Sequence, residues 1–241
     1  YAGDWMKLIR KWIAALCITG LILWPQQAFA SVSLFPALLR DPLLTLVNKD
    51  HPLSENWVME LTEIEEGYQV DRRMAEDLNA MFSDMRAEGL QPMICSAYRS
   101  YEMQAELHER EVEIYLNQGL SGEEARTEAG FWVAVPGCSE HQMGLAVDIV
   151  DASWPELDQS QEQTAVQQWL MAHCAEYGFI LRYPVDKSEI TGIGYEPWHY
   201  RYVGKRNAGN IMDSGLCLEE YLDLLEQNEK APFGHFFDLG A

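Results

Sequence analysis

The chain has 241 residues, enough for one large domain or two small ones. Its 17 Lys+Arg against 38 Asp+Glu give a formal net charge of −21, which argues against a nucleic-acid partner and against binding an anionic surface by charge alone. Hydrophobic residues (48%) and charged residues (23%) occur in the proportions of an ordinary globular protein, so the acidic excess is first a contribution to solubility.

The first 30 residues predict a signal peptide, although the five residues before Met6 do not fit one. From Met6 a basic start is followed by an apolar run at 13–23 and by an Ala-Phe-Ala cleavage signal at 28–30. The apolar run is shorter than the ~20 residues that span a membrane; an uncleaved anchor is the alternative, and the one membrane contact expected. The mature chain is therefore expected to begin at Ser31 and to be exported.

Cysteine usage fits an exported protein. Cys17 leaves with the signal peptide, and an even number of cysteines is left: Cys95, Cys138, Cys174 and Cys217. These permit two disulfides with three possible pairings. No C-x-x-C pair occurs, so a cysteine zinc site is not expected.

The first half of the mature chain predicts two helices around a short strand. Residues 31–50 form a lead-in segment with two prolines. Residues 68–90 carry methionines and a leucine at helical spacing and end at Gly89, which predicts a helix. Residues 92–100 predict a short strand that runs into a loop. Residues 101–120 predict a second helix that stops at Gly119.

The second half alternates in the same way. Residues 121–130 are a polar connection or a short helix, and a strand ends at Val150. A helix is predicted from about Gln161 to Tyr177, then a strand at 179–184, a loop at 185–194, a strand-like segment at 195–204 and a helix at 216–227. Interspersed helices and strands predict one α+β domain, placed at 51–225, with a C-terminal tail at 226–241.

One carboxylate lies where a buried strand is predicted. Asp148 interrupts an apolar run, and an unpaired buried charge costs several kcal/mol, so a cationic partner is expected. His141 lies seven residues earlier, and Gly144 between them allows a sharp turn. His199 follows an acid, Glu196, by three residues. Two histidines, an aspartate and a spare glutamate suit a zinc site with three ligands, an open position and a general base.

The spacing of Glu196 and His199 does not decide whether they face the same way. They would share a face in a helix but point oppositely in a regular strand, and Pro197 indicates an irregular segment. The sequence contains no H-E-x-x-H, no G-x-S-x-G and no phosphate-binding glycine loop, which sets those enzyme classes aside.

Three sequence elements resemble those of the VanY-type D-alanyl-D-alanine carboxypeptidases. They are S-x-Y-R-S-x-x-x-Q at 96–104, S-x-H-x-x-G-x-A-x-D at 139–148 and E-x-W-H at 196–199, in the family's order. The family belongs to a group of zinc peptidases that includes lysostaphin-like enzymes and the hedgehog signalling domain. The resemblance covers about 50–210 and implies the fold of that group, a small antiparallel sheet flanked by helices.

The resemblance also implies roles for individual residues. His141, Asp148 and His199 would bind Zn²⁺, and Glu196 would deprotonate the attacking water and return the proton to the leaving amine. Arg99 would lie near the scissile carbonyl or the terminal carboxylate of the substrate. Five further residues are assigned to the substrate site: Gln104, Ser139, Tyr98, Ser96 and Trp198, the last packing beside it.

The function that this implies is hydrolysis of the terminal D-Ala-D-Ala bond of peptidoglycan stem peptides by an exported zinc carboxypeptidase. One alternative keeps the site and changes the bond, an L,D-carboxypeptidase that trims tetrapeptide stems. Another is a non-catalytic zinc-containing module that binds the cell wall. The presence of Glu196 favours an enzyme, because a binding module has no need of the base.

Overall fold

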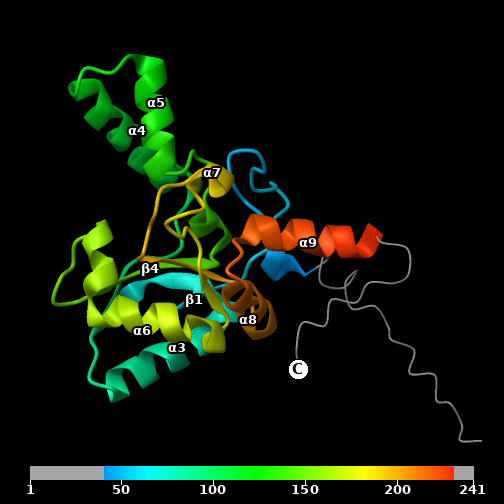
Figure 1. Ribbon diagram of the computed structural model, residues 1–241. Helices are drawn as coiled ribbons and strands as arrows, with labels where there is room; N and C mark the ends of the chain where they lie inside the picture. The colour runs from blue at the N-terminus through cyan, green and yellow to red at the C-terminus, as the bar shows by residue number, and fades with distance from the viewer. Residues whose placement is uncertain (1–40, 231–241) are drawn as a thin grey trace, which may run out of the picture. The chain divides into compact units, whose positions relative to one another are not determined.

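A computed structural model describes residues 41–230 of the chain. The predicted signal peptide, residues 31–40 of the predicted lead-in segment and the end of the predicted tail lie outside the described residues. The strands are β1 Leu61–Glu63, β2 Gln69–Asp71, β3 Pro92–Ser96, β4 Ala146–Asp151, β5 Phe179–Leu181 and β6 His199–Tyr202. The helices are α3 Arg72–Ala87, α4 Tyr101–Asn117, α5 Gly122–Trp132, α6 Ala165–His173, α7 Ser188–Thr191, α8 Lys205–Ser214 and α9 Leu218–Lys230 (Figure 1).

The centre of the fold is a four-stranded antiparallel sheet in the order β3-β4-β6-β5. The register pairs Asp148 of β4 with His199 of β6 on one side and with Ser96 of β3 on the other. A second sheet contains β1 and β2 alone. Mixed helices and small antiparallel sheets confirm the predicted α+β class.

The apolar core lies on one face of the central sheet. Val147 and Ile149 of β4 and Tyr200 of β6 join a buried cluster with side chains of α3 and α6, among them Leu78 and Leu170. Because alternate residues of a strand point to opposite faces, the residues between these core positions point to the other face. Asp148 and His199 are therefore placed together, away from the helices that form the core.

Several predicted elements differ from the observed ones at their ends. The first helix begins at Arg72, not at 68, because β2 precedes it and the Asp71 side chain accepts the N–H of Arg73 as its cap. The helix predicted at 161–177 is divided into 3-10 turns at Gln159–Gln163 and Cys174–Tyr177 around α6. The loop predicted at 185–194 contains the short helix α7, and residues 121–130 are helical, as one of the two predictions had it. Helix α8 was not predicted.

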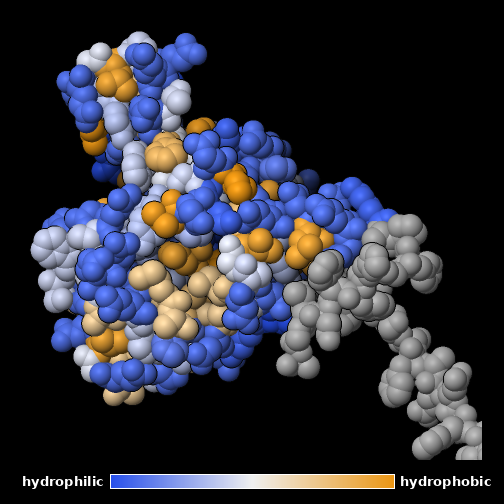
Figure 2. Space-filling model, in the orientation of Figure 1, coloured by the Kyte–Doolittle hydropathy of each residue, from blue (hydrophilic) through white to orange (hydrophobic). Residues whose placement is uncertain are grey.

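The hairpin of α4 and α5 lies apart from α3 and α6 in Figure 1. It has a small buried cluster of its own, made by Val112, Ala125 and Ala129. Hydrophilic residues cover most of the visible face in Figure 2, and none of the helices described at 41–230 is long and apolar enough to cross a membrane. Cys95, Cys138, Cys174 and Cys217 are all free thiols.

Candidate metal centre and cleft

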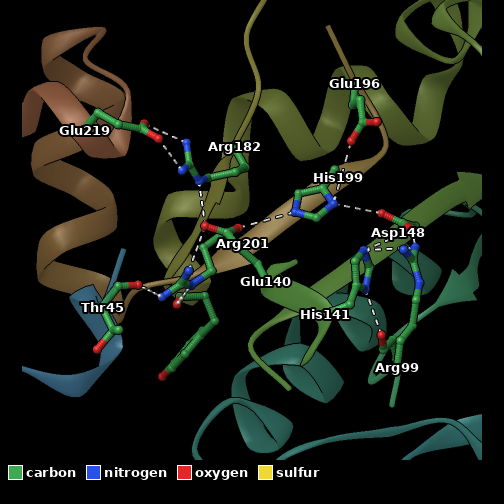
Figure 3. Close-up of polar contacts among 12 residues, drawn as sticks. Thr45, Arg99, Glu140, His141, Asp148, Arg182, Glu196, His199, Arg201 and Glu219 are labelled. Carbon is green, nitrogen blue, oxygen red and sulfur yellow. Dashed lines mark hydrogen bonds and ion pairs between the residues drawn. The ribbon is translucent and has the colours of Figure 1, made fainter. Parts of the chain in front are cut away.

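Three side chains converge on the face of the sheet opposite the core. His141 lies in the 3-10 turn Glu140–Met143 before β4, Asp148 lies in β4, and His199 begins β6. One ligand atom from each lies within 4.8 Å of the others, and all three residues are buried (Figure 3). The predicted ligand set is therefore brought together, by the register of β4 with β6 and by the turn at Gly144.

Gly144 makes this convergence possible. Its φ of 72° lies in the left-handed region, and it ends the 3-10 turn that carries His141. A Cβ atom at this position would lie 3.0 Å from the backbone nitrogen of Asp71 and 3.2 Å from Leu61 Cδ2. The site thus requires glycine for two reasons, its backbone conformation and the close approach of a neighbouring strand.

Hydrogen bonds behind the two imidazoles fix which nitrogen of each faces the cluster. His141 Nδ1 lies 2.7 Å from the carbonyl oxygen of Ala97, which can only accept, so Nδ1 carries the proton and Nε2 presents a lone pair. His199 Nε2 lies 3.4 Å from Glu140 Oε2, and its Nδ1 lies 3.1 Å from Asp148 Oδ1. The convergent atoms are His141 Nε2, an Asp148 carboxylate oxygen and His199 Nδ1.

This donor set fits Zn²⁺. Imidazole nitrogen and carboxylate oxygen are its usual ligands, and three protein ligands with a fourth position open to water or substrate are typical of catalytic zinc sites. Histidine ligands whose second nitrogen donates to a carbonyl or a carboxylate are held in one orientation, and both histidines have such a partner.

Glu196 reaches the cluster through a turn that the sequence did not define. Residues 197–198 form a turn, and the N–H of His199 donates to the Glu196 carbonyl at 3.2 Å. The strand begins only at His199, so the alternation of strand faces does not apply across this spacing. As a result Glu196 Oε2 lies 3.9 Å from His199 Nδ1 (Figure 3), and burial raises the pKa of the Glu196 carboxyl to about 8.

Arg99 gives Asp148 a cationic partner from the protein itself, where the sequence predicted a zinc ion as the partner and placed Arg99 near the substrate. Its Nη2 donates to Asp148 Oδ2 at 2.7 Å, its Nε to Ser96 Oγ at 2.8 Å and its Nη1 to Gln104 Oε1 at 3.1 Å. Although burial opposes ionisation, His141, His199 and Arg99 hold the pKa of Asp148 well below its usual value. An ionised aspartate in this strand is thus compensated by protein groups and also free to accept a metal.

The pKa values of the two histidines are shifted in opposite directions. Burial, followed by the positive charge of Arg99, lowers the pKa of His141 to about 4. Burial also acts to lower the pKa of His199, but its hydrogen bonds with Asp148 and Glu140 outweigh burial and raise the pKa to about 9. A cation that replaces the proton between His199 and Asp148 would be held by the same contacts.

The cluster lies in a cleft of about 480 Å³. Beside the three cluster residues, the cleft is lined by Arg99, Ser139, Glu196 and Trp198. The hairpin of α4 and α5 contributes four more lining residues: Leu107, Glu111, Tyr115 and Trp132. Three of the predicted substrate residues are not among the lining residues. Ser96 and Gln104 bond Arg99, and Gln104 also donates to the Ala134 carbonyl, so both support the guanidinium; Tyr98 lies outside the cleft wall.

Sequence reasoning missed two groups at the site. Tyr183 follows β5, lines the cleft and lies 4.8 Å from His199 between ring centroids. Glu140, Arg182 and Arg201 are buried on the far side of His199 and pair with one another. The signal for the arginines was present: each interrupts an apolar or aromatic strand, as Asp148 does.

Comparison with known proteins finds one matching family and several similar proteins. The sequence profile of the family described as VanY: D-alanyl-D-alanine carboxypeptidase matches residues 67–205. A D-alanyl-D-alanine carboxypeptidase of Enterococcus faecalis is 44% identical over 180 residues, which cover 75% of this chain and 65% of that protein. The chain thus spans just under two thirds of the length of that relative.

Two solved structures share the fold at high sequence identity. A variant of the vancomycin resistance D,D-pentapeptidase VanY in complex with Zn(II) is 43% identical with a TM-score of 0.68, over 74% of this chain and 98% of that one. The L,D-carboxypeptidase LdcB is 36% identical with a TM-score of 0.66, over 76% of this chain and 86% of that one.

Proposed function

The chain belongs to the VanY family of D-alanyl-D-alanine carboxypeptidases, and from this premise we propose that it is a zinc-dependent hydrolase that removes the terminal D-alanine from peptidoglycan stem peptides. The family and fold predicted from the three sequence motifs are thereby confirmed. The observation that carries the proposal is the convergence of His141, Asp148 and His199 at the floor of an open cleft, with Glu196 beside them.

The residues of the chain divide the work of hydrolysis. His141, Asp148 and His199 would hold Zn²⁺, which would supply a Lewis acid for the scissile carbonyl and a lowered pKa, toward about 7, for the attacking water. Glu196 lies at the edge of the cluster and accepts the proton of the attacking water. The same carboxyl then donates this proton to the leaving amine of D-alanine, a role that a buried carboxyl with a raised pKa suits.

Arg99 is placed to bind the carboxylate end of the substrate. Arg99 makes four contacts, with Ser96, Gln104, Asp148 and, at 3.1 Å, His141 Nε2, and the guanidinium still lines the cleft. Since a guanidinium has five N–H donors, one donor is left for a carboxylate or a developing oxyanion. The rest of the stem peptide follows the cleft toward the hairpin walls, where Tyr115 and Trp132 supply apolar contact.

The L,D-carboxypeptidase reading is supported by the likeness to LdcB. It uses the same cluster and base and differs in which stem enters the cleft. A non-catalytic wall-binding module is disfavoured because Glu196 and Arg99 are both present beside the cluster and both line the cleft.

Mass spectrometry of the products formed from synthetic pentapeptide and tetrapeptide stems tests the proposal. The zinc-loaded protein should release one D-alanine from the pentapeptide, and Glu196→Gln and chelator-treated protein should not. Glu189→Gln, a change on the exposed helix α7, is the matched control. Trimming of the tetrapeptide alone would replace the D,D assignment with L,D, and intact stems in every sample would refute both.

We propose further that the enzyme acts outside the cytoplasm, on the wall or its precursors. The basic start, apolar run and Ala-Phe-Ala signal of residues 1–30 support export. N-terminal sequencing of protein recovered from culture medium and cell envelope should find Ser31 as the first residue. Recovery of uncleaved protein in the cytoplasm alone would contradict it.

A further inference from the structure

A set of fully buried charges lies behind His199, on the side away from the metal cluster. The side chains of Glu140, Arg182 and Arg201 have 0% exposure. Arg182 Nε and Arg201 Nη1 both donate to Glu140 Oε1, at 2.7 and 2.8 Å (Figure 3). With Oε1 occupied by the two guanidiniums, Oε2 is left for His199 Nε2 at 3.4 Å.

The contact between Glu140 Oε2 and His199 Nε2 decides which nitrogen of the His199 ring carries the proton. A nitrogen that binds a metal needs its lone pair, so Nδ1 can act as a ligand only when the proton is on Nε2. A carboxylate is acceptor-only, and opposite Nε2 it stabilises that tautomer. The guanidiniums of Arg182 and Arg201 both donate to Glu140 Oε1, and this pairing holds the carboxyl as an ionised acceptor.

The network continues to segments at both ends of the domain. Arg182 donates to both carboxylate oxygens of Glu219 in α9, at 2.9 and 2.7 Å. Arg201 Nη2 donates to the carbonyl oxygens of Leu43 and Thr45, at 2.9 and 3.0 Å. Both attachments lie outside residues 67–205, the part matched by the family profile.

We propose that Glu140 is a positioning residue that fixes His199 as a metal ligand through Nδ1, and that Glu219 of α9 supports it through Arg182. The inference rests on the metal site of the proposed function. The charges agree with a supporting role, because two carboxylates and two guanidiniums cancel and leave no net charge behind the ligand. Their mutual hydrogen bonds also compensate the burial of each group.

Glu219→Gln is the first test, since it changes the far end of the network and leaves the metal cluster untouched. It keeps the size of the side chain and removes the charge that holds Arg182 from outside. Glu226→Gln is the control: Glu226 is on the same helix and pairs with Lys230 at an exposed position. Zinc affinity is measured by competition with a chromophoric chelator, on the full-length protein.

Glu140→Gln tests the centre of the network. Loss of a partner that orients a metal-binding histidine weakens metal binding about 10- to 100-fold, and Glu219→Gln should weaken zinc binding by a smaller factor in the same direction. Selective ¹⁵N labelling of histidine reports on the Nε2–H group of His199 in the zinc-loaded protein, and Glu140→Gln should shift its resonance and speed the exchange of its proton with water. Glu140→Asp, which keeps the acceptor charge, should restore part of the affinity.

The outcomes are separable from those of the stem-peptide assay, because zinc affinity and imidazole shifts need no substrate. If Glu140→Gln does not fold, Glu219→Gln against Glu226→Gln still decides. Zinc affinities of Glu219→Gln and Glu226→Gln that are both equal to wild type, or an unchanged His199 spectrum in a folded Glu140→Gln protein, would overturn the proposal. If the zinc-loaded wild-type protein leaves the stem peptides intact while the Glu140 and Glu219 variants bind zinc more weakly, the proposed activity is refuted and the positioning role stays in place.

Discussion

Gly144→Ala perturbs the point on which the geometry of the metal centre depends. The backbone of Gly144 has a φ of 72°, which costs a residue with a Cβ about 1–2 kcal/mol. The added methyl group would also lie 3.0 Å from the Asp71 nitrogen, and this nitrogen cannot move freely because it donates to the Gly144 carbonyl at 2.8 Å. Overpacking of this kind costs about 1–3 kcal/mol more.

Gly119→Ala separates the two contributions. Gly119 follows α4 and its cap residue with a φ of 95°, and nothing lies within 4 Å of the position of its Cβ. This substitution therefore carries the conformational cost of about 1–2 kcal/mol alone, whereas Gly144→Ala should cost about 2–5 kcal/mol in all.

Thermal unfolding of the two variants measures the difference. For a domain of this size each kcal/mol shifts Tm by about 2–4 °C, so Gly144→Ala should melt about 2–12 °C below Gly119→Ala. Zinc binding should also weaken only in Gly144→Ala, since its turn carries His141 toward Asp148. Equal Tm values for the two variants would show that the close approach to Asp71 has no energetic weight, and the reasoning would fail.

Three further predictions concern the site itself. Between about pH 6.5 and 9 the zinc-free protein should lose stability as pH rises. The pKa values of Glu196 and His199 are raised to about 8 and about 9 in the folded protein, so both keep protons that the unfolded chain releases near 4.5 and 6.5. A Tm that rises over this range would contradict this prediction. Zinc at ~100 times its Kd should stabilise the protein by about 2.7 kcal/mol, seen as a Tm that falls on chelation and recovers when zinc is added back, and a Tm indifferent to zinc would argue against a folded-state site. Arg99→Lys should lower kcat/KM about 10- to 100-fold, since an ammonium cannot reproduce the fork that joins Ser96, Gln104 and Asp148; steady-state kinetics at wild-type level would rule that out.

The sequence singled out the three residues that the structure brings together as a candidate metal site, because their environment is anomalous at the level of single positions. Asp148 stands in an apolar run, and the histidines stand near it or near a second acid. The faces of the sheet follow from the same alternation, which placed Val147 and Ile149 in the core. What spacing could not supply was the orientation of Glu196, because that depends on where β6 begins, and β6 begins at His199 after a turn.

Element boundaries were lost where tertiary contacts override local pattern. The helical spacing of residues 161–177 is real, yet Gln161 is fully buried and bonds the backbone of the Trp154 and Glu156 segment, which interrupts the helix there. The turn at Gly178 is closed by Tyr202 and Lys205, whose atoms a Cβ would meet at 2.7 and 3.0 Å. Such contacts join residues that are distant in sequence, so a local pattern does not contain them.

The arginines behind His199 show how far the reasoning from Asp148 extends. Arg182 and Arg201 lie in or next to buried strands, and the requirement that a buried charge be compensated applies to them equally. What differs is the chemistry of the groups that meet each charge. Around Asp148 an N–H group of Arg99 meets the charge and His141 turns a lone pair inward, which suits a cation, while Arg182 and Arg201 direct N–H groups to a carboxylate and need none. A buried charge in a strand therefore predicts compensation from the sequence, but only a lone pair that faces it from a neighbouring side chain indicates that a metal joins the compensating side chains.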